Sequence, residues 1–173
     1  MNLTIKILGA FLVVASTTSM GIKKSKSFSD RLEYLENMQL CINQLKNEIN
    51  YTQTPLINAI EKIISSSFGI TRSIFVFFLE ELSFAGDESI KKLWDNAIGK
   101  YHDKISESDY ILLTSLGNNL GNCDLEGQLK NFALFESRIS QAIKTAHSEK
   151  EKFSKLYRNL GIYSGLLIAT LFL

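Results

Sequence analysis

The chain has almost no proline and no pattern of paired cysteines. Its 173 residues include one proline and two cysteines. Because proline interrupts helices and strand-like alternation is rare here, the sequence predicts long helices and an all-α fold. Cys41 and Cys123 lack CxxC spacing, so they indicate neither a disulfide framework nor a zinc site, and they fit a reducing compartment.

The chain also lacks an excess of charge of one sign. Its formal net charge is +1, which gives no global basic field of the kind that attracts nucleic acid. The charges are unevenly placed, because Lys6 is the only charged residue before Lys23 and none follows Arg158. Both ends of the chain are therefore apolar, and we expect no nucleic-acid partner.

Residues 1–22 are predicted to form an N-terminal membrane anchor. At 1.5 Å per residue, about 20 apolar residues of helix cross the bilayer core. A secretory signal peptide is the rival reading, since the small residues 15–19 suit a cleavage site, but its basic leading region is weak. Lys23, Lys24 and Lys26 follow the apolar run instead. Positive charge stays on the cytoplasmic side, which favours a retained anchor followed by a cytosolic segment.

Residues 159–173 are predicted to form a C-terminal apolar membrane segment. Gly161 and Gly165 have GxxxG spacing, which predicts a membrane helix contact. The uncharged tail is about 21 Å long as a helix, which is short for a full span. Basic residues precede it, so the same charge argument places residues 23–158 in the cytosol as a helical bundle. These residues are Lys150, Lys152, Lys155 and Arg158.

The middle of the chain reads as an antiparallel bundle of about six helices. Apolar residues recur at spacings of four and three from Phe28 to Ile49, which is typical of a helix that packs on another helix. Thr54 is expected to cap a second helix with Pro55 at its first position. That helix should break at residues 65–69, and the next should run from near Thr71 to near Gly86. The residues of its aromatic cluster, which we expect in the core, are Ile74, Phe75, Phe77, Phe78, Leu82 and Phe84.

Two more turns divide the rest of the bundle. A helix carrying Trp94 is expected from Asp87 or Glu88 to Tyr101. Ser106 and Asp109 suggest a capping pair that opens a helix ending at Leu120. A final helix, free of proline and glycine between Gly127 and Gly161, should then run directly into the apolar tail.

Residues 116–128 are predicted to be the main hinge of the chain. Gly121 suits the left-handed end of a helix, and Asp124 suits the first turn of the next one. Gly117 lies four residues before Gly121 on the same helical face, where the missing side chains would let another helix come close. A helical corner is favoured here over a ligand site.

Residues with the spacing of a catalytic, cofactor or metal site are not found in this sequence. Residues 21–25 resemble the end of a phosphate loop, but the second glycine before the lysine is missing and the run follows an apolar helix. His102 and His147 have no second ligand or nucleophile beside them. We therefore expect no enzyme activity, no cofactor and no metal.

The spacing of three motifs resembles the stage III sporulation protein AB family of endospore-forming bacteria. They are Glu48-Ile49-x-Tyr51-x-x-Thr54-Pro55-Leu56, Leu116-Gly117-x-x-Leu120-Gly121-x-x-Asp124-x-x-x-Gln128 and Leu160-Gly161-x-x-x-Gly165, together with the N-terminal anchor and Trp94. On this basis Gly117, Gly121, Asp124 and Gln128, with Pro55, are taken as structural hinge residues. Cys123 is a departure, since a hydroxyl residue is expected there.

The resemblance implies a function as well as a fold. The family is similar to the cytoplasmic helical domain of the type II secretion F protein, a membrane platform that meets an ATPase. The resemblance implies that the chain is a component of the channel-like apparatus between mother cell and forespore and that it lies in the mother-cell membrane. The implied partners are a stage III sporulation protein AA-like ATPase, other channel components and membrane lipid, and the chain could form oligomers. Exposed charges are the candidate partner contacts, namely Glu126, Lys130, Lys150, Glu151 and Lys155. A structural membrane clamp that contacts no ATPase is the alternative.

Overall fold

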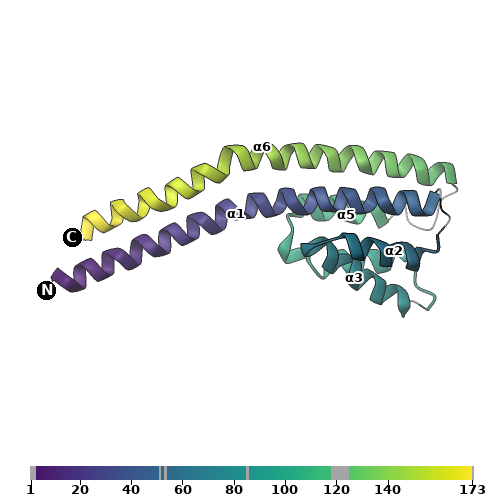
Figure 1. Cartoon of the computed structure of the whole chain (residues 1–173), viewed down its shortest axis with the longest axis horizontal. Helices are drawn as coiled ribbons and strands as arrows, with labels where there is room; N and C mark the ends of the chain where they lie inside the picture. The colour runs from purple at the N-terminus through teal and green to yellow at the C-terminus, as the bar shows by residue number, and fades with distance from the viewer. Residues whose placement is uncertain (1–2, 51, 53, 85, 118–124, 173) are drawn as a thin grey trace. The chain divides into compact units, whose positions relative to one another are not determined.

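The structure, a computed structural model, describes residues 3–50, 52, 54–84, 86–117 and 125–172. Within these residues the chain contains no strand, which confirms the all-α prediction. The described residues form six α-helices, and a short 3-10 helix, η1, separates α4 from α5. Figure 1 labels α1, α2, α3, α5 and α6. The elements are α1 (Leu3–Asn50), α2 (Leu56–Ser66), α3 (Gly69–Ser83), α4 (Ile90–Gly99), η1 (His102–Lys104), α5 (Glu107–Gly117) and α6 (Leu125–Phe172).

The chain divides into two compact units. The first unit comprises Met1–Leu32 and Lys144–Leu173, and the second comprises Glu33–Ile143. Helices α1 and α6 have 48 residues each and contribute to both units. The sequence predicted about 30 residues of final helix running into an apolar tail, and α6 is a single helix through both glycines of that tail.

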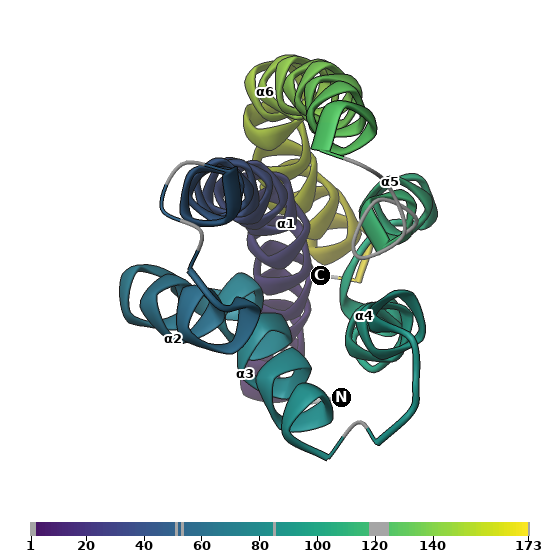
Figure 2. The same ribbon diagram turned by 90° about the vertical axis from the view of Figure 1, so that its right-hand side faces the viewer.

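In the second unit, short helices pack in chain order. Helix α2 packs on α3, α3 on α4, and α4 on α5, and Figure 2 labels all four of these helices. Apolar side chains from every α-helix are fully buried, and each removes enough surface from water to contribute roughly 1.5–3 kcal/mol. The largest are Leu35, Met38, Ile42, Leu45, Ile60, Ile63, Ile74, Phe75, Phe78, Trp94, Phe132 and Phe135.

Trp94 on α4 joins three of these helices. Its ring meets Phe78 edge-on with 5.1 Å between centroids, and Phe75 lies 5.7 Å away. Its indole N–H donates a 2.8 Å hydrogen bond to the Leu113 carbonyl, which belongs to α5. A buried indole needs such a partner, so one side chain supplies both apolar contact and a polar link.

The aromatic cluster of α3 is only partly in the core. Ile74, Phe75 and Phe78 are fully buried as expected, but Phe84 is 89% exposed, so the prediction that it is a core residue is wrong. Helix α3 ends at Ser83, and Phe84 follows as its C-cap with φ −111° and ψ 10°. At 3.6 residues per turn, a continued helix would also carry Phe84 away from the side that buries Phe75 and Phe78, so its position in the sequence accounts for its exposure.

The connection from α1 to α2 differs from the predicted cap. Pro55, with φ −52° and ψ 140°, is the N-cap of α2 rather than its first helical residue, and no side chain caps this end. The Thr54 hydroxyl donates to Glu48 Oε2 at 2.7 Å instead. Glu48 also accepts a 2.7 Å bond from Lys62 Nζ, so the carboxylate fastens the end of α1 to the start and body of α2.

Of two later helix starts, that of α4 differs from the prediction, and at α5 Ser106 caps the helix as predicted. Helix α4 begins at Ile90, and Ser89 caps it by accepting a hydrogen bond from the Lys92 N–H at 3.3 Å. At α5 the Asp109 N–H does donate to Ser106 Oγ at 3.2 Å. The Asp109 carboxylate is also buried and accepts a hydrogen bond from the Tyr34 hydroxyl of α1, so a residue in the first turn of α5 also makes a tertiary contact.

Candidate functional site

The two long helices of the first unit meet through small residues. Figure 1 shows the purple start of α1 beside the yellow end of α6. A Cβ built on Gly21 would lie 3.0 Å from Gly161 Cα, and one built on Gly165 would lie 3.0 Å from Val14 Cα. Thr17, one turn before Gly21, also touches the Gly165 position. Glycine is needed at these positions because the two backbones leave no room for a side chain.

Gly161 and Gly165 are the residues singled out by their GxxxG spacing, whereas Gly21 and Thr17 were missed. The signal was present, because Thr17-x-x-x-Gly21 repeats the same four-residue spacing of small residues on the other helix. Reading either motif alone could not show that the two would lie against each other.

Large apolar side chains point away from this contact. In a water-soluble helix pair most of them would lie between the helices, but here the close contact is made at Val14, Thr17 and Gly21 of α1 and at Gly161 and Gly165 of α6. Both helices contribute exposed side chains, which are at least 36% accessible. They are Ile7, Leu8, Phe11, Leu12, Met20, Ile22, Leu156, Tyr157, Leu160, Ile162, Tyr163, Leu166, Leu167 and Leu171.

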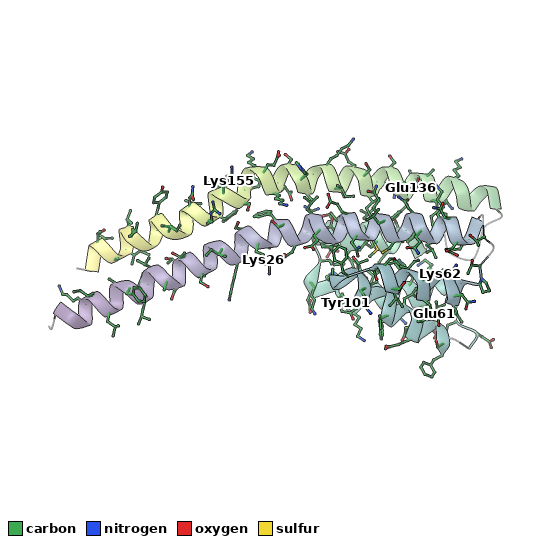
Figure 3. All side chains as sticks on the ribbon, viewed as in Figure 1. Lys26, Glu61, Lys62, Tyr101, Glu136 and Lys155 are labelled. Atoms are coloured by element: carbon green, nitrogen blue, oxygen red, sulfur yellow. The ribbon has the colours of Figure 1, made fainter. Side chains whose placement is uncertain are left out.

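On each of the two helices the apolar stretch ends at basic residues, and these two ends lie side by side. Gly21 lies against Gly161, and a 2.6 Å hydrogen bond between the Ser25 and Ser154 hydroxyls continues the pairing. The lysines that follow residue 22 on α1 therefore lie opposite those that precede residue 159 on α6, and Figure 3 labels one from each helix, Lys26 and Lys155. We call this set the basic collar. It consists of Lys23, Lys24, Lys26, Lys150, Lys152, Lys155 and Arg158.

Aromatic rings fill the space between the helices at the collar. Phe28 of α1 stacks on Phe153 at 5.9 Å and on Tyr157 at 5.7 Å between centroids. Lys24 Nζ lies 5.6 Å from the Phe28 centroid, and Lys152 Nζ lies 5.2 Å from that of Phe153. Such cation and ring contacts contribute about 0.5–1 kcal/mol each at exposed sites, so they orient the lysine stems more than they stabilise the unit.

An ion pair closes the first unit beyond the collar. Arg31 Nη1 lies 2.5 Å from Glu149 Oε2, and both side chains are only partly exposed. In the second unit Lys46 and Glu136 form a similar pair at 2.9 Å between α1 and α6. Each unit thus has its own polar link between the two long helices.

The hinge residues of the second unit are only partly within the described residues. Gly117 ends α5, and a Cβ on it would lie 2.8 Å from Cδ1 of Trp94 and 3.4 Å from the Lys91 carbonyl oxygen. Helix α4 therefore comes close at this glycine. Gly121 and Asp124 lie outside the described residues, as does the side chain of Gln128.

The candidate partner contacts do not form one cluster. Lys130 is exposed on α6 in the second unit, whereas Lys150, Glu151 and Lys155 belong to the first unit. Glu151 Oε1 lies 3.8 Å from His147 Nδ1. The side chain of Glu126 lies outside the described residues.

A buried polar cluster in the second unit was not found from the sequence. Besides the Tyr34 and Asp109 contact, the Thr71 hydroxyl donates to the Tyr34 carbonyl at 3.2 Å, and Asn37 Oδ1 accepts from the Phe68 N–H at 3.2 Å. These bonds tie α1 to α5 and to the start of α3. Buried polar groups need partners, so the cluster fixes which faces of these helices meet.

Groups of acidic, histidine and cysteine side chains that could hold a metal are not found in the part of the chain that the structure describes. His102 Nε2 lies 2.9 Å from Glu107 on the exposed side of α5, where the pair has the geometry of a surface contact. Burial raises the pKa of the Cys41 thiol to about 11, which opposes thiolate chemistry at neutral pH.

Comparison with known proteins decides the family. A family model described as stage III sporulation protein AB matches residues 6–173, essentially the whole chain. The chain belongs to the stage III sporulation protein AB family. Its similarity to the stage III sporulation protein AB of Bacillus subtilis (strain 168) is 28% identity over 169 residues, covering 96% of this chain and 98% of the relative.

A solved structure of stage III sporulation protein AB supports the fold. It superposes with a TM-score of 0.66 at 25% identity and covers 71% of this chain and 98% of its own. The family assignment expected from the three motifs is thus confirmed, and with it a protein of the sporulation process and a helical fold.

Proposed function

We propose that this chain is a non-enzymatic membrane platform in the channel-like apparatus that connects mother cell and forespore, and that it docks a cytosolic ATPase similar to stage III sporulation protein AA. Family membership supports the sporulation setting. The arrangement of the first unit, with small residues between the helices and large apolar residues outside, is the observation that carries the membrane part.

Lipid explains this arrangement better than water does. In a bilayer, lipid tails solvate a leucine side chain about as favourably as other apolar side chains do, so burying leucine between helices gains little. Helices there pack through small residues, which let the two backbones come close. In water, the exposed apolar surface of these helices would be unusually large. Helix α1 is the helix among the described residues that is long and apolar enough to cross a membrane by length and composition. The close contact at Gly161 lets the shorter apolar end of α6 enter the bilayer beside α1.

The basic collar supports a topology in which both apolar ends insert from the mother-cell cytosol. The collar residues follow the apolar stretch of α1 and precede that of α6, so both flanks place positive charge on the same side. The membrane is the mother-cell membrane that faces the forespore, and the second unit lies in the cytosol.

Labelling in intact cells tests this topology. A single cysteine at residue 103, introduced as Asp103→Cys in a Cys123→Ser background, should stay unlabelled by a membrane-impermeant reagent until the cells are opened, because residue 103 is exposed on η1. Cys41 is buried and contributes little background. Labelling of residue 103 in intact cells would contradict a cytosolic second unit.

The second unit supports the docking part of the proposal. It is a packed bundle that carries exposed apolar side chains on several helices, with Leu40 66% accessible, Phe84 89%, Ile111 61% and Leu134 52%. Exposed apolar and charged side chains together are the usual makeup of a protein contact, with charges at the rim tuning the association rate. In this proposal the ATPase supplies the energy and the chain supplies the surface on which it docks.

Binding across a salt series tests the docking. The full chain in phospholipid nanodiscs should bind the ATPase at low salt, and the affinity should fall as salt rises if rim charges contribute. Lys130→Glu on α6 should weaken binding, whereas Lys92→Glu on α4, where Lys92 pairs with Glu88, should not. A folded, inserted chain that fails to bind the ATPase at low salt would favour the alternative of a structural membrane clamp.

A further inference from the structure

The basic collar lies where the exposed apolar surface of the first unit ends. Because Gly21 lies against Gly161, the change from Ile22 to Lys23 on one helix lies near the change from Leu160 to Arg158 on the other. Cations from both helices are therefore brought to one level, directly beside side chains that are half exposed or more, such as Ile22 and Leu160.

The positive charge of the collar is not neutralised by the chain itself. Glu151 is the single acidic residue within residues 23–28 and 150–158. Among the described residues, the collar lysines and Arg158 take part in no salt bridge, although the acids near them do, as Arg31 with Glu149 shows. All collar residues are exposed except Lys150, which is half-buried.

The aromatic rings beneath the collar suit the boundary between lipid and water. Tyr157 is 36% exposed and stacks on Phe28, so its ring lies on apolar side chains at the same level as the cations. Lys24 Nζ lies over both rings, at 5.6 Å from Phe28 and 6.0 Å from Tyr157. Amphipathic rings with lysines beside them are typical of the headgroup region of a bilayer.

We propose that the basic collar binds the phosphate headgroups of anionic phospholipids in the leaflet where the two helices enter the membrane. The proposal rests on the membrane part of the proposed function and adds the class of lipid. Continuity with the exposed apolar surface favours lipid over an acidic protein, because a lipid places its phosphate and its apolar chains side by side as the collar and the helices do. Lysine ammonium groups act as mobile point charges, which suits headgroups that exchange rapidly.

Two matched variants of the full chain separate the collar from charge in general. The collar variant carries K24Q, K26Q, K155Q and R158Q. The control variant removes the same number and type of cations from exposed positions of the second unit, through R72Q, K91Q, K92Q and K104Q. Circular dichroism confirms that each is helical before it is used.

Lipid selectivity in vesicles is the measurement. Each protein is reconstituted in phosphatidylcholine vesicles with a trace of spin-labelled phosphatidylglycerol or phosphatidylcholine, and the fraction of motionally restricted lipid gives relative association constants. Wild type should prefer phosphatidylglycerol by roughly tenfold at low ionic strength, since each cation near the surface attracts anionic lipid. The control variant should keep this preference, the collar variant should fall to about twofold or less, and salt should weaken it.

The other outcomes are distinguishable. An inserted wild type without preference for phosphatidylglycerol would overturn the lipid role of the collar, leave the membrane proposal standing and point to an acidic protein partner. Equal loss in both variants would also overturn it, because net charge rather than the collar would then be responsible. A chain that enters no vesicle of either composition would instead contradict the proposed function.

Discussion

Gly21 of α1 and Gly161 of α6 lie so close together that neither position has room for a side chain. A Cβ on Gly21 would lie 2.7 Å from the Tyr157 carbonyl oxygen, and a Cβ on Gly161 would lie 2.7 Å from the Thr17 carbonyl oxygen. Both obstacles are backbone atoms, which cannot rotate away as a side chain can. The contact between the two helices therefore depends on glycine at both positions.

Replacing either glycine by alanine should separate the two helices of the first unit. Gly21→Ala and Gly161→Ala are each expected to destabilise the full chain in detergent by about 1–3 kcal/mol, because backbone must shift to admit the methyl group. Thermal unfolding followed by circular dichroism measures the effect. Gly9→Ala is the control, since nothing lies within 4 Å of a Cβ there. Equal melting of all three variants would show that the close contact does not form.

Gly117 should be equally sensitive in the second unit. Gly117→Ala places a Cβ 2.8 Å from Trp94 Cδ1, so the indole must move and its hydrogen bond to Leu113 is strained. We expect a loss of about 1–3 kcal/mol and a change in tryptophan emission, which reports on Trp94 alone because the chain has one tryptophan. Gly99→Ala, with nothing within 4 Å, should leave both stability and emission unchanged.

The Glu48 carboxyl should titrate at a lower pH than an ordinary glutamate. The Lys62 ammonium, and then the Thr54 hydroxyl, donate to it and lower its pKa from 4.5. Because the pKa is lower in the folded chain, the resulting stabilisation is present above the unfolded pKa and is lost as pH falls through the folded pKa. Lys62→Gln should raise the pKa of Glu48 in a carbon-detected NMR titration, whereas Lys92→Gln, which removes the ion pair with Glu88, should not.

Cys41 should resist alkylation as long as the chain is folded. Burial raises the pKa of its thiol to about 11, so at pH 8 the thiolate fraction is on the order of one in a thousand, and the sulfur is also shielded. In a Cys123→Ser variant, iodoacetamide at pH 8 should modify Cys41 slowly in the native chain and rapidly in guanidinium, as measured by mass spectrometry. Fast modification under native conditions would show that this face of α1 is open.

Local pattern alone predicts much of the fold. Apolar residues at spacings of three and four from Phe28 to Ile49 give the helix and its buried face, because a helix has a fixed repeat and only one side can pack. The near absence of proline allows α1 and α6 to run uninterrupted. The sequence alone also shows the spacing of Gly161 and Gly165 and the basic residues that flank the apolar ends.

Tertiary contacts decide what those residues do. The N–H of Asp109 donates to Ser106 as the capping prediction expects, but its carboxylate also accepts from the hydroxyl of Tyr34, 75 positions away in the sequence. The hydroxyl of Thr54 donates to Glu48 rather than capping α2. A short polar side chain has several partners within reach, and only the packed chain selects one. Neither small-residue motif shows which residue of the other helix it will contact, so the pairing of Gly21 with Gly161 could not be predicted from them. Sliding one helix along the other leaves both sequences unchanged, and backbone contact between the helices fixes the register that brings the basic residues together.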